Sequence, residues 1–116
     1  MPLTRDFKAT IKARAEKDSA FREALLTEAL DGFLAGDSDT GKAMLRDYIN
    51  ATIGFEALGR LTGKDAKSLM RMLSPHGNPH ARNLFAVLAH LQSREGVHFH
   101  VHPAREKGGT TMRTES

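Results

Sequence analysis

Residues 55–74 read FEALGRLTGKDAKSLMRMLS, and this stretch carries the strongest local structural signal in the chain. Two short amphipathic segments, 55–62 and 65–73, are separated by only two residues. Gly63 tolerates the positive φ that a tight turn requires, and Gly59 allows two helix axes to approach closely. The spacing therefore predicts a helix-turn-helix unit.

Side chains around this turn match the prediction. Leu58, Leu69 and Met72 are spaced to fill the wedge between the two helices, and Asp65 is placed to cap the second helix. Lys64 occupies a position that is usually apolar in such units. We expect its stem to lie in the wedge and its ammonium group to reach solvent.

The second helix of the unit has a polar outer face. Lys67 and Arg71 lie four residues apart, hence on one side of the helix, with Ser68 beside them. In DNA-binding units of this kind that face enters the major groove, where an arginine pairs with guanine. Lys64 and Arg82 are expected to neutralise phosphates. The alternative is an ordinary solvated face of a helical bundle.

Helical periodicity extends upstream of this unit. A basic segment around Phe7 and Ile11 predicts a first helix, a second begins at Asp18 or Ser19 and ends at Gly36, and a third ends at Gly54. The positions expected to face the core are Phe21, Leu25, Ala29, Leu30, Phe33, Leu34, Met44, Leu45, Tyr48, Ile49, Thr52 and Ile53.

Downstream, the sequence SPHGNPH at 74–80 interrupts the helical pattern. We expect Asn78 to cap a last helix and Pro79 to occupy its first position. In this interpretation the backbone amides at the start of the helix hold a phosphate. The flanking His76 and His80 are either turn residues or phosphate donors. This helix ends at Gly96, and its expected inner face is Ala81, Leu84, Phe85, Leu88 and Leu91.

Residues 97–102 read VHFHVH, a strict alternation that predicts a short β-strand. Because no other segment alternates in this way, its expected partner is the same strand in a second copy of the chain. An extended tail lying on the helices is the alternative. His98, His100 and His102 would share one face, which is either a polar solvent face or a zinc or nickel site. No metal is assigned.

Composition limits the function further. The 116 residues carry a net charge of +3, and 40% of them are hydrophobic. With no cysteine, the chain cannot form disulfides or thiolate zinc sites. We expect a cytoplasmic protein, since neither a signal segment nor a membrane-length apolar run is evident. No catalytic motif is recognisable, so we expect neither an enzyme nor a cofactor.

Charge is unevenly distributed along the chain. Residues 18–40 contain six acidic side chains and one basic side chain, whereas residues 55–82 contain five basic and two acidic ones. The basic segment coincides with the predicted helix-turn-helix. The acidic segment is either a solvated helix face or a surface for a basic protein partner.

The runs LGRLTGKDAKSLMRMLSPHGNP at 58–79 and LFAVLAHLQSREGV at 84–97 resemble the HigA-type "addiction module antidote" regulators. The resemblance rests on the TG turn, the recognition helix ending in LS, the GNP turn and the closing helix. It implies a λ-repressor-like all-α fold, binding to operator DNA as a dimer, and binding to a RelE-like toxin. It also implies that Lys67, Ser68 and Arg71 read the DNA.

Taken together, the sequence predicts an all-α, λ-repressor-like bundle with a short C-terminal strand. Its expected parts are a basic segment at 1–17, a helix-turn-helix domain at 18–102 and a disordered tail at 103–116. The predicted function is a homodimeric, sequence-specific repressor of its own operon, acting as the antitoxin of a toxin pair. The alternative is a toxin-neutralising or metal-binding interaction protein without significant DNA binding.

Overall fold

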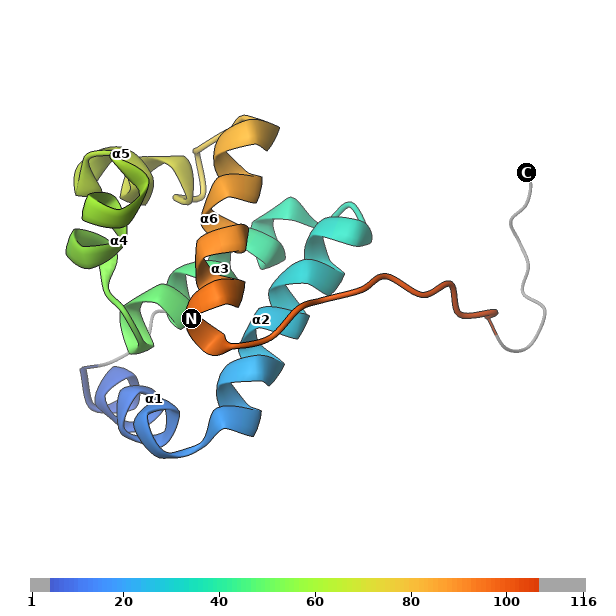
Figure 1. Ribbon diagram of the computed structural model, residues 1–116, viewed down its shortest axis with the longest axis horizontal. Coiled ribbons are helices and arrows are strands. Elements are labelled where there is room, and N and C mark those ends of the chain that lie inside the picture. Colours follow the sequence, from blue (N-terminus) through green and yellow to red (C-terminus); the bar gives the residue numbers. More distant parts are fainter. Residues whose placement is uncertain (1–4, 107–116) are drawn as a thin grey trace.

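The computed structural model describes residues 5–106, and within this range the chain forms six α-helices and no β-strand. The helices are α1 (Arg5–Lys17), α2 (Ser19–Leu34), α3 (Ser38–Ala51), α4 (Phe55–Thr62), α5 (Ala66–Met72) and α6 (Ala81–Glu95). In Figure 1, α6 runs through the middle of the molecule, with α4 and α5 on one side and α2 on the other. The all-α prediction is confirmed.

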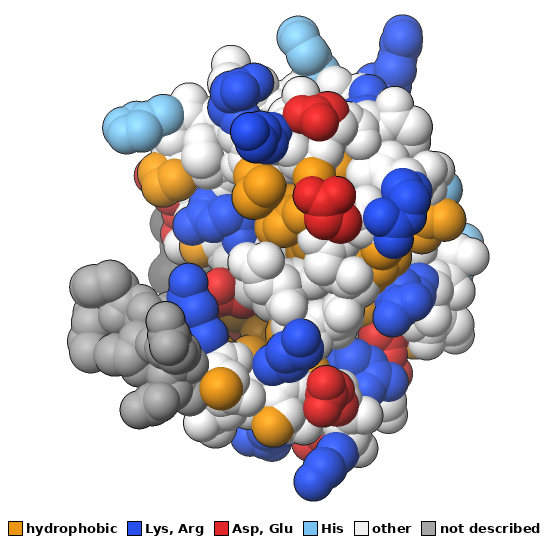
Figure 2. Space-filling view, turned by 90° about the vertical axis from the view of Figure 1, so that its left-hand side faces the viewer, with side chains coloured by type: hydrophobic (Ala, Val, Ile, Leu, Met, Phe, Trp, Pro, Cys, Tyr) orange, Lys and Arg blue, Asp and Glu red, His pale blue; other side chains and the backbone are white. Residues whose placement is uncertain are grey.

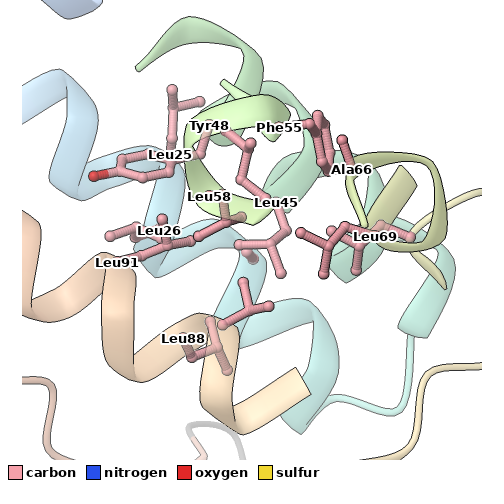
Figure 3. Close-up of a cluster of buried hydrophobic side chains, with 14 residues drawn as sticks. Leu25, Leu26, Leu45, Tyr48, Phe55, Leu58, Ala66, Leu69, Leu88 and Leu91 are labelled. Atoms are coloured by element: carbon pink, nitrogen blue, oxygen red, sulfur yellow. The ribbon is translucent and has the colours of Figure 1, made fainter. Parts of the chain in front are cut away.

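A single cluster of buried apolar side chains joins α2 to α6 (Figure 3). Leu26 of α2, Leu45 of α3, Leu58 of α4, Leu69 of α5 and Leu91 of α6 are each at most 1% exposed. Removing one leucine side chain from water contributes about 1.5–3 kcal/mol. The helix-turn-helix is therefore part of the common core rather than an appendage.

Most of the predicted inner positions are buried or packed against this core, but Ala81, the first residue of α6, is exposed, and so are two larger side chains. Leu34 is 66% exposed because it is the last residue of α2, and Phe85 is 63% exposed on α6. Conversely, Leu26 is buried although it lies outside the predicted stripe. Since α2 is covered on more than one side, it buries the adjacent Leu25 and Leu26 together, which a single-stripe pattern does not anticipate.

A polar network ties α6 to α2 and α3. The Arg22 Nε atom donates to both carboxylate oxygens of Glu95, at 3.1 and 2.9 Å, and the Tyr48 hydroxyl donates to the same carboxylate at 2.5 Å. Arg22 also donates to the carbonyl of Ala15 in α1. Burial and the nearby Glu95 carboxylate raise the pKa of the Tyr48 hydroxyl, which therefore remains a donor.

The last helix begins later than predicted. Asn78 does not cap it and Pro79 is not its first residue; α6 starts at Ala81, with His80 as the cap residue. His80, with φ of −67° and ψ of 144°, has the extended backbone of a cap residue, so Pro79 precedes the helix instead of opening it. In addition, the Lys42 ammonium group binds the carbonyl of Gly77 at 2.7 Å and so holds the preceding turn against α3.

The predicted strand at 97–102 is not confirmed, because this segment has no regular structure in the described part of the chain. Its backbone is anchored at Phe99, whose N–H donates to the Gln92 side chain at 2.9 Å and whose ring packs on the core. Residues 100–102 still border a hollow beside α2 and α6, and the chain then runs away from the helices (Figure 1). Of the predicted tail, residues 107–116 lie outside the described residues.

Candidate nucleic-acid interface

The turn between α4 and α5 has the predicted geometry. Gly63 follows α4 in the left-handed region, with φ of 71°, and the Lys64 N–H donates to the Gly59 carbonyl at 3.0 Å. A Cβ atom on Gly59 would lie 2.6 Å from the carbonyl oxygen of Lys64. Glycine is therefore required at both positions, once for its conformation and once for its size.

The inner side of α5 is fixed by the core and by a cap. Ala66 and Leu69 are buried, and the Ser68 N–H donates to the Asp65 carboxylate at 3.2 Å. Lys64 is half-buried and lines the surface hollow beside α5. Because Asp65 is engaged in capping, its charge stabilises the start of α5.

The outer side of α5 carries no packing partner among the described residues. Lys67, Ser68, Met70 and Arg71 are all exposed, and Met70 is 42% exposed. Figure 2 shows the α4–α5 side of the molecule, where Lys and Arg side chains are spread over the surface with Asp and Glu side chains among them. The outer face of α5 thus combines two basic side chains with a hydroxyl and an exposed methionine, and it projects from a helix whose other side is buried.

A surface hollow of about 710 Å³ lies between α5 and the turn that leads into α6. Three of the predicted contact residues, Lys64, Ser68 and Arg71, line this hollow. The opposite wall is formed by residues 76–80 together with Asn83. The hollow thus brings basic and hydrogen-bonding side chains from α5 and from the turn to one place.

The other two predicted residues lie outside this hollow. Arg82 is exposed at the start of α6, beside a smaller depression that it lines with His80 and Asn83. Lys67 is on the exposed face of α5 but does not line the hollow. The five residues are therefore distributed in a strip over α5 and the start of α6, with three of them at one hollow and two outside it.

The start of α6 is a further polar element of this strip. Its cap residue, His80, forms no side-chain cap hydrogen bond, and the first helical bond runs from the Leu84 N–H to the His80 carbonyl at 2.9 Å. Helix N-termini favour anions because their free N–H groups and dipole are positive. The start of α6 therefore adds a positive partial charge beside the hollow, which His80 and Asn83 line.

Sequence reasoning missed two contributors to the interface. Asn83 lines both depressions, but a single asparagine inside a helix gives no signal of its position. Lys42 on α3 is only 4% exposed and supports the turn from behind. Lys42 lies on the same face of α3 as Leu45 and Ile49, and this pattern could have indicated a buried lysine. A buried ammonium group needs hydrogen-bond acceptors, so a contact with a nearby turn could have been expected.

The three histidines after α6 form a row of exposed rings. The ring centroids of His98 and His100 are 4.8 Å apart, and those of His100 and His102 are 6.3 Å apart. Within residues 5–106, however, no group of three or more His, Cys, Asp or Glu side chains is arranged to hold a metal ion. The row therefore offers at most a pair of neighbouring imidazoles from one chain.

Comparisons of the chain with models of protein families, with characterised proteins and with solved structures give no match. The resemblance to antidote regulators consequently rests on the turn and helix motifs quoted above. None of the described helices has both the length and the apolar character needed to cross a membrane.

Proposed function

We propose that this protein is a sequence-specific DNA-binding transcriptional regulator that inserts α5 into the major groove. The observation that carries the proposal is the division of α5 into two sides. Ala66 and Leu69 fix one side in the core, whereas Lys67, Ser68 and Arg71 are presented together on the other. A short, rigidly held helix with a basic and hydrogen-bonding outer face is the element that reads base edges in such proteins.

The contacts divide into two kinds. Arg71 is assigned to a guanine, through a two-pronged contact, and Ser68 to a neighbouring base. Lys64, Arg82 and the start of α6 are assigned to phosphates, and Lys67 lies between the two groups. Phosphate contacts fix the register of the protein on the duplex, and base contacts select the sequence.

The proposal includes a λ-repressor-like arrangement and a homodimer. Segment 97–102 leaves the bundle in an irregular course, and its alternating sequence suits pairing with a second copy about a two-fold axis. Two copies of α5 would then occupy successive major grooves about 34 Å apart, on inverted half-sites. In keeping with the motif resemblance, we assign the protein the role of an antitoxin that represses its own operon and binds a RelE-like toxin.

A second candidate is a protein-interaction module without significant DNA binding. It is favoured by a largely apolar hollow between α2, α6 and the segment after α6, around which Leu34, Phe85 and Val101 are 66%, 63% and 75% exposed. Asp31 lines the same hollow, so a partner with apolar and basic side chains would fit.

Selection of tight-binding duplexes from a random pool, followed by footprinting, tests the DNA proposal. We expect an inverted repeat with half-sites centred about 10 base pairs apart. Affinity should fall steeply with salt, because phosphate contacts release counterions. Lys64→Ala should reduce the slope of log K against log salt by about one unit without altering base preference. Selection of no sequence, with a salt slope near zero, would favour the interaction module instead.

A further inference from the structure

A buried lysine connects α3 to the turn that forms one wall of the proposed interface. Lys42 is 4% exposed, and its ammonium group donates to the carbonyls of Pro75 at 3.2 Å and Gly77 at 2.7 Å. The Asp39 carboxylate lies 3.8 Å from the same nitrogen. Two of the three N–H donors of the ammonium group are thus hydrogen-bonded to turn carbonyls, and Asp39 is close enough for an ion pair but not for a hydrogen bond.

The neighbouring turn of α3 makes a second contact of the same kind. Arg46, four residues after Lys42, donates to the carbonyl of Leu73, the residue that follows α5. Cations near the C-terminal end of a helix satisfy carbonyls that have no partner within the helix. Two basic side chains of α3 therefore hold the end of α5 and the turn after it.

The opposite side of the turn is packed against α5 itself. A Cβ atom on Gly77 would overlap the carbonyl oxygens of Arg71 and Met72, so the turn backbone lies directly against the end of α5. The Gly77 N–H donates to the Ser74 carbonyl at 2.9 Å, which closes the turn. With Lys42 on one side and α5 on the other, the turn has little freedom to move.

We propose that Lys42 is a positioning residue for DNA recognition, which fixes the turn at 74–80 relative to the base-reading face of α5. This inference rests on the proposed function. Base contacts by Ser68 and Arg71 and phosphate contacts by the turn and the start of α6 must be made at the same time, and they come from opposite walls of the hollow. If the turn moves relative to α5, the protein cannot make the base contacts and the phosphate contacts at the same time.

The test compares Lys42→Met with Lys12→Met. Both variants lose one positive charge, but Lys12 is exposed on α1 and makes no contact with the turn. Relative to Lys12→Met, we expect Lys42→Met to lose about tenfold or more in affinity for the selected duplex, the size of one lost base contact. Affinity for an unrelated duplex should be equal in the two variants, because non-specific binding depends on overall charge.

Equal affinities of the two variants for the selected duplex, or an equal loss on both duplexes, would overturn the positioning role. If Lys42→Met does not fold, Lys42→Gln is compared with Lys12→Gln by the same criterion, since its amide keeps the buried site polar while its side chain is uncharged and one atom too short to bind the turn as Lys42 does.

Hydrogen exchange separates this inference from the proposed function. If the wild-type chain shows no sequence preference, the DNA proposal fails, but the anchoring of the turn is still measurable. At matched global stability, faster exchange of the Gly77 amide in Lys42→Met than in Lys12→Met supports the anchor. Unchanged exchange rejects it.

Discussion

The α4–α5 unit and the segment after α6 are held in very different ways. The unit is fixed by two glycines at its turn, by the Asp65 cap and by side chains in the core, and its far end is bound by Lys42 and Arg46. The segment from Gly96 onward is anchored mainly at Phe99, and Val101 is 75% exposed.

The α4–α5 unit is a complete structure within one chain, whereas the segment after α6 lacks, among the described residues, a partner for the strand that its sequence predicts. At the turn and the end of the α4–α5 unit, backbone groups find partners within the unit or on α3: the Lys64 N–H on Gly59, the Ser68 N–H on Asp65, and the Leu73 carbonyl on Arg46. The alternating residues at 97–102 have two distinct sides but no neighbouring strand in the described chain. A regular strand at this place requires a partner, which is the reason for assigning it to a dimer.

The two regions should differ most in how much unfolding free energy is lost when one apolar side chain is truncated in each. Leu69 is 1% exposed in the common core, so Leu69→Ala should lower the free energy of unfolding by about 2–5 kcal/mol. Phe99 is only partly buried, and Phe99→Ala should cost less than Leu69→Ala although it removes more atoms. Urea unfolding followed by circular dichroism measures both. A larger loss for Phe99→Ala would mean that the segment after α6 belongs to the core.

A smaller loss of unfolding free energy is expected from a substitution where α6 meets α2 and α3, close to the start of the segment after α6. Glu95→Gln retains the shape of the side chain but removes the charge that Arg22 and Tyr48 bind. Hydrogen bonds to charged groups contribute about 1.5–3 kcal/mol, and we expect a loss of unfolding free energy in this range. Arg14→Gln, in an exposed pair with Asp18, serves as the control and should be nearly neutral.

Much of the fold was predictable because its signals are local. Gly59, Gly63 and Asp65 encode the turn through size, conformation and capping, and all three act as predicted. The start of α6 was not predictable from Asn78 and Pro79, because a distant residue, Lys42, holds the turn before it. The strand failed to form for a related reason: alternation specifies two faces but contains no information about a partner.

Removing the segment should affect assembly more than folding. We expect the full chain to be a dimer by light scattering, and a chain lacking residues 97–116 to be monomeric while keeping the helical circular dichroism signal. The reason is that residues 97–102 supply the proposed strand pairing, while the core cluster lies within α2–α6 apart from the partly buried Phe99. A truncated chain that remains dimeric would place the interface on the helices.

The smallest expected effect concerns the pH dependence of stability and involves α2 and α3, which lie outside both regions. Asp18 and Asp37 cap α2 and α3, and the hydrogen bonds from the Phe21 amide and from Thr40, respectively, lower the pKa of each carboxyl. Their contribution to stability is therefore present above the carboxyl pKa of the unfolded chain and is lost as the pH falls through the folded values. Replacing both with asparagine, which still caps, should make the melting temperature less sensitive to acid below about pH 4. An unchanged acid dependence would contradict this assignment.

The most direct test of the account is the effect of Arg71→Ala on sequence discrimination. Arg71 is exposed on α5, and Arg94, exposed near the other end of α6, provides a control that removes the same charge. In a mobility-shift assay, Arg71→Ala should weaken binding to the selected duplex by about 1–3 kcal/mol and relax the choice of one base, whereas Arg94→Ala should leave base preference unchanged. If Arg71→Ala binds the selected duplex with the affinity and base preference of the wild type, α5 does not read the major groove and the proposed function is wrong.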